Sequence, residues 1–113
     1  MLFRSGPHAK TIGSIDLFDL DPPHRRAGTG ILIANNGDRR KGFAAEALNL
    51  LQEYAFGVLG LHQLYCHIHS DNLPSIRLFK GAGFKPCGEL KDWTQTNGQW
   101  KTVEIFQKIN GQD

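Results

Sequence analysis

The sequence predicts an α/β fold of the α+β type, with its elements in the order β-β-α-β-α-β-β. Short apolar runs bounded by turn residues, which are typical of strands, occur near both ends of the chain. Between them, apolar residues recur every three or four positions over one long stretch, as on an amphipathic helix. The 113 residues are enough for one small domain, 1–113, and not for two.

Two strands and the long helix are expected in the first half of the chain. Residues 11–20 form the first strand, and a proline pair ends it because proline cannot donate to a strand ladder. Residues 28–34 form the second strand, which contains the apolar run Ile31-Leu32-Ile33. Residues 44–59 form the helix, and its apolar stripe consists of Ala44, Ala47, Leu48, Leu51, Ala55 and Val58.

The second half is expected to hold a strand, a short helix and a hairpin. The strand covers residues 61–70, and the helix covers residues 73–82, with Asn72 as its N-cap. Asn97-Gly98 is a dipeptide favoured in tight hairpin turns. The hairpin strands around it are residues 84–93 and 99–109.

Composition and charge exclude several classes of partner. The formal net charge of +2 is too small to argue for nucleic acid. No apolar run approaches the roughly 18 residues of a membrane helix, and the first residues lack the apolar run of a signal peptide. Cys66 and Cys87 form no CxxC pair, which suits a reduced cytosol. We therefore expect a cytoplasmic protein without a nucleic-acid or membrane partner.

A basic loop with a glycine precedes the long helix and reads Arg39-Arg40-Lys41-Gly42-Phe43-Ala44. The first N–H groups of a helix have no internal partner, and the helix dipole favours an anion there. Gly42 allows the backbone to approach a ligand closely, and the basic side chains add positive charge. The loop therefore predicts a phosphate or pyrophosphate site. The alternative is a solvated basic turn.

Two motifs resemble those of the GNAT superfamily of N-acetyltransferases. Arg39-x-x-Gly42-x-Ala44 is similar to its acyl-CoA loop, [QR]-x-x-G-x-[GA]. The second motif, Asn72-x-x-Ser75-x-x-Leu78-Phe79-x-x-x-Gly83-Phe84, resembles the superfamily element N-x-x-[SA]-x-x-L-[YF]-x-x-x-G-F. Both motifs occur in the expected order with a strand between them, and the likeness covers nearly the whole chain.

The resemblance implies a mixed, mostly antiparallel sheet with two splayed central strands and acetyl-CoA in the gap between them. The backbone of Leu32 and Ile33 would pair with the pantetheine arm, and an N–H near Ile33 would polarise the thioester carbonyl. The loop amides would hold the pyrophosphate, the Asn72 side chain would contact the pantetheine, and no metal is implied. The implied binding residues are Leu32, Ile33, Arg39, Arg40, Lys41, Gly42, Phe43, Ala44, Asn72, Ser75 and Phe79.

The implied reaction is direct attack of a primary amine on the acetyl thioester. An alkyl ammonium must lose a proton first, and His67 is the candidate base because imidazole titrates near neutral pH. The alternatives are a half-buried structural histidine or, with His69, a metal ligand that lacks a nearby third partner. Tyr65 is expected to pack. Phe79 stands where many relatives carry a tyrosine that protonates the leaving thiolate, so we expect slower turnover.

The likeness is greatest to the spermidine N-acetyltransferase branch and the ribosomal-protein N-acetyltransferases. The residues that resemble the spermidine branch are His24-Arg25-Arg26, Leu61-His62, Tyr65 and His67. Gly28 departs from this branch, which tends to carry an acid there. Family members also usually begin with a strand and two helices that this chain lacks. The shorter sheet would expose an edge, so we expect a homodimer.

Three functions are compatible with these residues. The leading one is an acetyl-CoA-dependent N-acetyltransferase that acts on a polyamine, a protein N-terminus or a small metabolite. The second is an acetyl-CoA-binding module with little or no catalytic activity, which Phe79 and the short N-terminal part favour. The third, a nucleic-acid binder that uses the basic loop, rests on charge alone.

Overall fold

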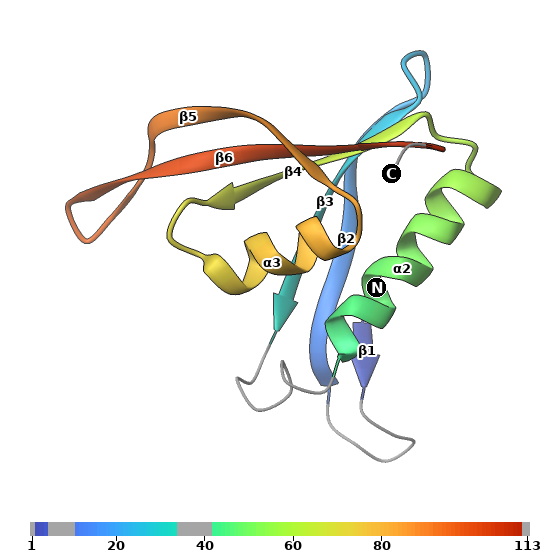
Figure 1. Ribbon diagram of the computed structural model, residues 1–113, viewed down its shortest axis with the longest axis horizontal. Helices are drawn as coiled ribbons and strands as arrows, with labels where there is room; N and C mark the ends of the chain where they lie inside the picture. Colours follow the sequence, from blue (N-terminus) through green and yellow to red (C-terminus); the bar gives the residue numbers. More distant parts are fainter. Residues whose placement is uncertain (1, 5–10, 34–41, 112–113) are drawn as a thin grey trace.

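The computed structural model describes residues 2–4, 11–33 and 42–111 (Figure 1). They form six strands, two α-helices and one short π-helix within these ranges. In chain order the elements are β1 (Leu2–Arg4), β2 (Thr11–Asp21), β3 (Arg26–Ile33), α2 (Phe43–Glu53), the π-helix (Tyr54–Val58), β4 (Gln63–His69), α3 (Leu73–Gly81), β5 (Lys85–Thr96) and β6 (Gln99–Ile109).

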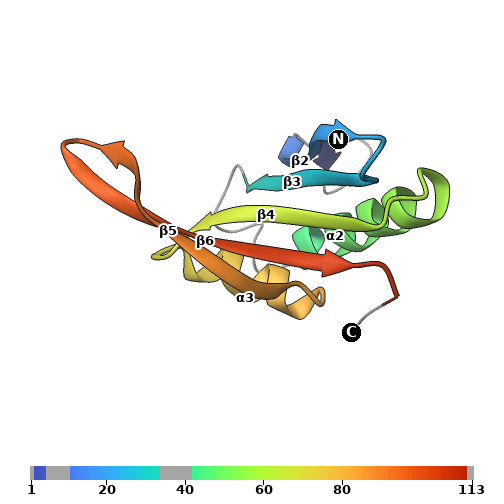
Figure 2. The same ribbon diagram turned by 90° about the horizontal axis from the view of Figure 1, so that it is seen from above.

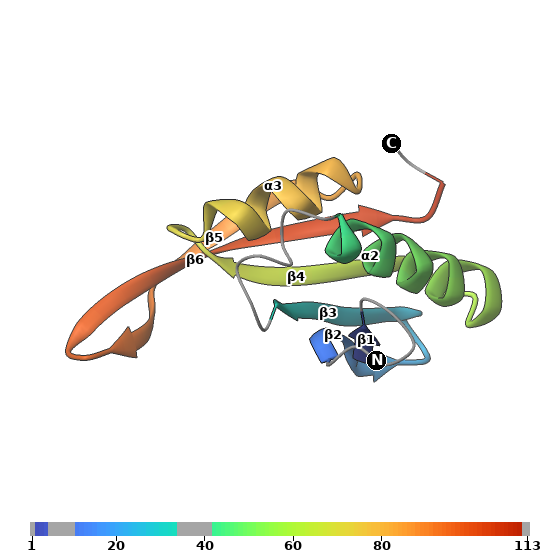
Figure 3. The same ribbon diagram turned by 90° about the horizontal axis from the view of Figure 1, so that it is seen from below.

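The strands form one sheet in the order β1-β2-β3-β4-β6-β5. The β3–β4 pair is parallel and the other pairs are antiparallel, so the mostly antiparallel sheet is confirmed. Both α-helices lie on the same face of the sheet, as Figures 2 and 3 show from opposite sides. We call the opposite face the outer face.

The parallel pair at the centre of the sheet is short. Residues 26–28 of β3 pair with residues 63–65 of β4, and Gly28 with Tyr65 is the last pair. Beyond it, β3 continues alongside β2, while β4 continues alongside β6. Figure 1 shows the two arrows diverging, with α3 near their separated ends. The splayed central strands are therefore confirmed, and the gap opens at Thr29.

The core lies between the sheet and the two helices. From α2, the predicted apolar stripe contributes Ala47, Leu48 and Leu51, and Leu48 is completely buried. Phe79 from α3 and Phe106 from β6 fill the neighbouring region. Burying a side chain of this size stabilises the folded state by about 1.5–3 kcal/mol. This packing fixes both helices against the strands that border the gap.

Two features differ from the sequence prediction. β1 was not predicted, because three residues are too few for a periodic pattern and the strand depends on pairing with β2. The helix expected over residues 44–59 changes at Tyr54 into the π-helix, and Gly60, with a φ of 67°, follows its end. Val58, which was expected in the apolar stripe, is exposed in the π-helix because the wider turn breaks the spacing of three and four residues. The predicted hairpin turn is confirmed, since Asn97 and Gly98 both have the positive φ angles of a type I′ turn.

Candidate functional site

The gap between β3 and β4 contains a cavity of about 130 Å³. It begins where strand pairing ends, so the open backbone edges of both strands border it. Residues of α3 and its N-cap also line it. The lining residues are Thr29, Gly30 and Ile31 from β3, Cys66, His67 and Ile68 from β4, and Asn72, Ser75 and Phe79 from α3 and its cap.

Asn72 is held at this cavity by helix capping. Its Oδ1 accepts a hydrogen bond from the Ser75 backbone N–H at 3.3 Å, as an N-cap does, and Pro74 lies in the first turn. The cap uses the side-chain oxygen, and Nδ2 has no hydrogen-bond partner within the described ranges. Asn72 can therefore donate to a ligand in the gap.

An ion pair anchors the preceding residue. Lys101 Nζ on β6 donates to Asp71 Oδ2 at 2.8 Å. This hydrogen bond, together with the charge of Lys101, lowers the pKa of Asp71. The contact ties the turn between β4 and α3 to the neighbouring strand and so helps to position Asn72.

Gly42 begins α2 in a conformation that suits glycine. It is the N-cap with a φ of 75°, and its carbonyl accepts the backbone N–H of Glu46 at 3.1 Å. A Cβ added here would meet no atom within 4 Å. Phe43 is half-buried and Ala44 is buried at the start of the helix. The first N–H groups of α2 lack helical partners, as expected for an anion site.

The remaining predicted binding residues are placed as follows. Leu32 and Ile33 belong to β3 beyond its divergence from β4, and there their backbone pairs with β2. Arg39, Arg40 and Lys41 lie outside the described residues. Ser75 and Phe79 line the gap cavity together with Asn72. The structure thus brings three of the predicted binding residues to one cavity.

Thr29 is a cavity residue that sequence reasoning missed. It lies on the helix side of β3, like Ala27, and only 1% of its surface is exposed. Its Oγ1 is buried and has no hydrogen-bond partner within the described parts of the chain. One signal was available: Thr29 is a polar residue between Gly28 and Gly30 at an inward position of an apolar strand.

Phe79 and Cys66 supply apolar walls. The Phe79 ring is 2% exposed and packs edge-on against Phe84, with centroids 5.0 Å apart and planes at 89°. Burial raises the pKa of Cys66 to about 12, so its thiol is protonated at neutral pH. Cys66 is therefore unsuited to act as a nucleophile.

His67 lies at the edge of the cavity and is exposed. Its ring is 6.2 Å from that of Tyr65, and Tyr65 in turn contacts Phe18 edge-on at 6.4 Å. These side chains point to the outer face, because the residues that alternate with them on β4 are buried. The packing role expected for Tyr65 agrees with its contact with Phe18. His67 is accessible to a substrate on the outer face.

Within the described residues, His67 and His69 have no third side chain beside them that could complete a metal site. Nε2 of His69 pairs with Thr94 Oγ1 at 3.0 Å. No three His, Cys, Asp or Glu side chains gather within the described ranges. Nor does any described helix have the length and apolar character needed to cross a membrane.

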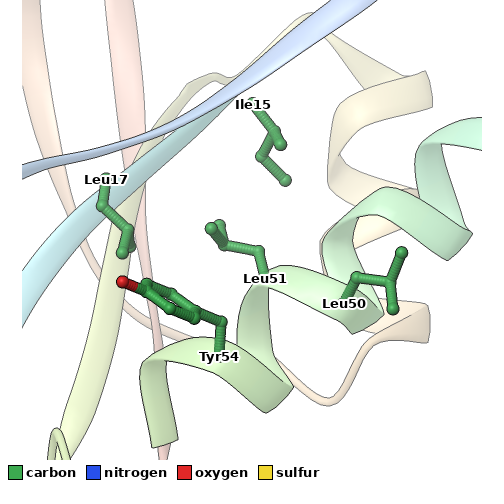
Figure 4. Close-up of a pocket in the computed structure, with 5 residues that line it drawn as sticks. All are labelled: Ile15, Leu17, Leu50, Leu51 and Tyr54. Carbon is green, nitrogen blue, oxygen red and sulfur yellow. The ribbon is translucent and has the colours of Figure 1, made fainter. Parts of the chain in front are cut away.

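A second hollow lies between α2 and β2 (Figure 4). Its volume is about 370 Å³, and its only side-chain polar group is the hydroxyl of Tyr54. A hollow of this composition can accept apolar groups but offers no acid–base pair. Its lining residues are Ile15, Leu17, Leu50, Leu51 and Tyr54.

The cavity between splayed strands, lined in part by the second sequence motif, is the feature by which the class of protein can be tested. A family model described as an acetyltransferase (GNAT) domain matches residues 2–85. The chain therefore belongs to the GNAT acetyltransferase family, and the resemblance inferred from the two motifs is confirmed.

The spermidine N(1)-acetyltransferase of Vibrio cholerae is 32% identical over 93 residues, which are 82% of this chain and 53% of that protein. An uncharacterized N-acetyltransferase of Bacillus subtilis, YoaA, is 36% identical over 98 residues, 87% of this chain and 55% of that protein. The chain thus spans about half the length of these relatives.

Solved structures match the fold as well. The V. cholerae spermidine N-acetyltransferase in complex with CoA and spermine superposes with a TM-score of 0.86 at 28% identity, covering 94% of this chain and 62% of that one. An F149A mutant of the same enzyme also gives a TM-score of 0.86, over 96% of this chain and 63% of that one. These matches agree with the expected likeness to the spermidine branch.

Proposed function

We propose that this chain carries the acetyl-CoA site of an N-acetyltransferase and takes part in transferring the acetyl group to a primary amine. The observation that supports this proposal is the cavity that opens where β3 and β4 separate, which is lined by both strands and by the cap of α3. An extended thioester-bearing arm fits such a gap, because unpaired strand edges offer backbone hydrogen bonds along its length. A solved relative with CoA bound supports this choice of ligand.

Several residues would hold the co-substrate. The backbone of Leu32 and Ile33 would pair with the pantetheine arm, and Nδ2 of Asn72 would donate to it. Gly42, Phe43 and Ala44 at the start of α2 would present N–H groups to the pyrophosphate, because these groups lack helical partners. Arg39, Arg40 and Lys41 precede them in sequence and would add positive charge.

The chemistry would take place at the boundary between the cavity and the outer face. Acetyl-CoA supplies the activated acetyl group, and an amine approaching from the outer face would meet His67 beside the cavity. His67 would accept the proton that the amine must lose. The thiol of Cys66 stays protonated at neutral pH, which favours direct attack over an acetyl-cysteine intermediate.

Calorimetric titration of acetyl-CoA tests the site, with Gly42→Asp and Gly42→Asn as a matched pair. Asp and Asn both tolerate a positive φ, and a side chain at position 42 would meet no neighbouring atom within 4 Å of its Cβ. Asp also favours a helix N-terminus, so it should not destabilise α2. Since only Asp adds a negative charge, we expect Asp to weaken binding at least about tenfold more than Asn. Equal affinities in the two variants, or no binding by the folded wild type, would contradict the site.

A binding module with little or no turnover is the second candidate. The observation that favours it is the buried Phe79, whose ring lines the cavity without a hydroxyl group. Acetylation assays with spermidine, a peptide N-terminus and small primary amines distinguish the transferase from the binding module. Acetyl-CoA binding without product from any of these amines would favour the module.

We further propose a polyamine as the acceptor and a homodimer as the assembly. Relatives named spermidine N-acetyltransferases support a polyamine, with a protein N-terminus or a small metabolite as other acceptors. A homodimer is proposed from the edge of the sheet, where the three-residue β1 is the terminal strand. Light scattering that finds a monomer would contradict the dimer. We propose a cytoplasmic location.

A further inference from the structure

The buried hydroxyl of Thr29 has no partner inside the described protein. A buried hydroxyl without a hydrogen bond costs about 1–3 kcal/mol, which valine, nearly identical in shape, would avoid. The unpaired hydroxyl belongs to the residue directly after the last β3–β4 pair, where the cavity begins. A polar atom left unpaired in the wall of a cavity indicates a ligand that pairs with it.

The surroundings of Thr29 restrict what that ligand group can be. Among the residues that line the same cavity, Cys66 has a protonated thiol and Phe79 offers only an apolar ring. The amide of Asn72 and the hydroxyl of Ser75 come from α3 and its cap. A backbone N–H of β3 beyond the divergence can donate a hydrogen bond to a carbonyl oxygen of the ligand. Thr29 is the hydroxyl donor on the β3 side, directly after the point where strand pairing ends.

We propose that the Thr29 hydroxyl donates a hydrogen bond to the thioester sulfur of the bound acyl-CoA and stabilises the thiolate that leaves. This inference rests on the proposed acetyl-CoA site. A thioester offers only acceptors, so a donor is what its sulfur requires as negative charge develops. Thr29 would thus supply a donor that the buried Phe79 ring cannot.

The step balances without covalent change to the protein. The amine nitrogen forms a bond to the carbonyl carbon, and the carbon–sulfur bond breaks with its electron pair moving to sulfur. Thr29 keeps its proton while it donates the hydrogen bond. The amine proton passes to His67, and the thiolate takes a proton from solvent. The interaction strengthens as charge accumulates, so it should act on kcat more than on KM.

Thr29→Val and Thr29→Ser test this role in the full chain. Valine keeps the shape and removes the donor, while serine keeps the donor. We expect Thr29→Val to lower kcat about tenfold or more with KM for acetyl-CoA changed less than about threefold, and Thr29→Ser to retain most of kcat. Because valine removes an unpaired buried hydroxyl, free Thr29→Val should unfold at the same or a higher temperature than wild type.

A binding measurement tests the role of Thr29 in a chain that shows no turnover. CoA and desulfo-CoA, which lacks the sulfur, are titrated at pH 9, where a fraction of the free CoA thiol is ionised. Wild type should prefer CoA about tenfold, and Thr29→Val should lose this preference while its affinity for desulfo-CoA is unchanged. Equal preference in both proteins, or a Thr29→Val that unfolds at lower temperature and binds both ligands weakly, would overturn the role of Thr29. Failure of wild type to bind either ligand would overturn the acetyl-CoA site itself.

Discussion

The ring of Phe18 on β2 lies over Gly28 on β3, so closely that a Cβ on Gly28 would overlap the ring. The two residues are direct cross-strand partners, and Tyr65 on β4 forms a T-shaped pair with the same ring. The absence of a side chain at Gly28 therefore lets Phe18 approach the strand that borders the cavity. An aromatic surface thus leads across the outer face to His67.

Gly28→Ala is expected to destabilise the fold by up to about 1 kcal/mol, because the new methyl group must push the partly exposed Phe18 ring outward. Urea denaturation measures this change. Gly30→Ala is the matched control, since a Cβ there would lie 3.7 Å from the same ring, an ordinary contact. The penalty should disappear in a Phe18→Ala background. A Gly28→Ala chain as stable as Gly30→Ala would contradict the packing argument.

Phe79→Tyr is expected to raise the rate of acetyl transfer. The position lines the cavity, so a tyrosine hydroxyl there could protonate the leaving thiolate, an effect typically worth 10²–10⁴-fold for a general acid. The same hydroxyl is buried near Phe84 and should cost about 1–3 kcal/mol of stability if it finds no partner. Steady-state kinetics with a confirmed amine give the answer, and an unchanged kcat would argue against this role.

His67→Gln is expected to lower kcat by about 10²–10⁴-fold if the imidazole is the base. Because His67 is exposed, the fold and the affinity for acetyl-CoA should change little. His69→Gln is the control, since His69 points to the same face two residues later and pairs with Thr94. Equal losses in the two variants would indicate a structural effect on β4.

The thiol of Cys66 is expected to resist alkylation while that of Cys87 reacts. Cys87 is exposed, whereas Cys66 is buried and burial raises its pKa to about 12. At pH 8 such a thiol is roughly one part in 10⁴ thiolate, which is the reactive form. Mass spectrometry after iodoacetamide treatment should find one label, on Cys87. Acetylation of Cys66 during turnover would contradict direct attack.

Asp71→Asn is expected to lower the urea midpoint slightly at pH 7, because it weakens the hydrogen bond from Lys101. The pKa of Asp71 is lower in the folded chain than in the unfolded one, so its contribution is present above the unfolded value and is lost as pH falls through the folded value. The difference from wild type should therefore vanish at acidic pH. Glu89→Gln is the control, since its contact with Lys91 is longer, 3.9 Å, and exposed. A difference that persists at low pH would exclude the ion pair as its cause.

Local sequence was sufficient wherever a structure depends on neighbouring residues. The cap at Asn72 joins groups three positions apart, and Asn97-Gly98 adopts its turn because both residues tolerate positive φ. The apolar stripe of α2 follows from its own spacing. The two motifs that resemble the GNAT superfamily lie in such segments, so the family could be inferred before the fold was known.

Tertiary structure decided what depends on distant partners. The sequence indicated splayed strands only by resemblance, and pairing shows that they part after Gly28 and Tyr65. Periodicity indicates that Thr29 points inward, but only the packed structure leaves its hydroxyl unpaired in a cavity wall. The contact between Phe18 and Gly28 likewise joins two strands. A sequence pattern tells which face a side chain takes, whereas what that side chain meets is set by elements brought together from elsewhere in the chain.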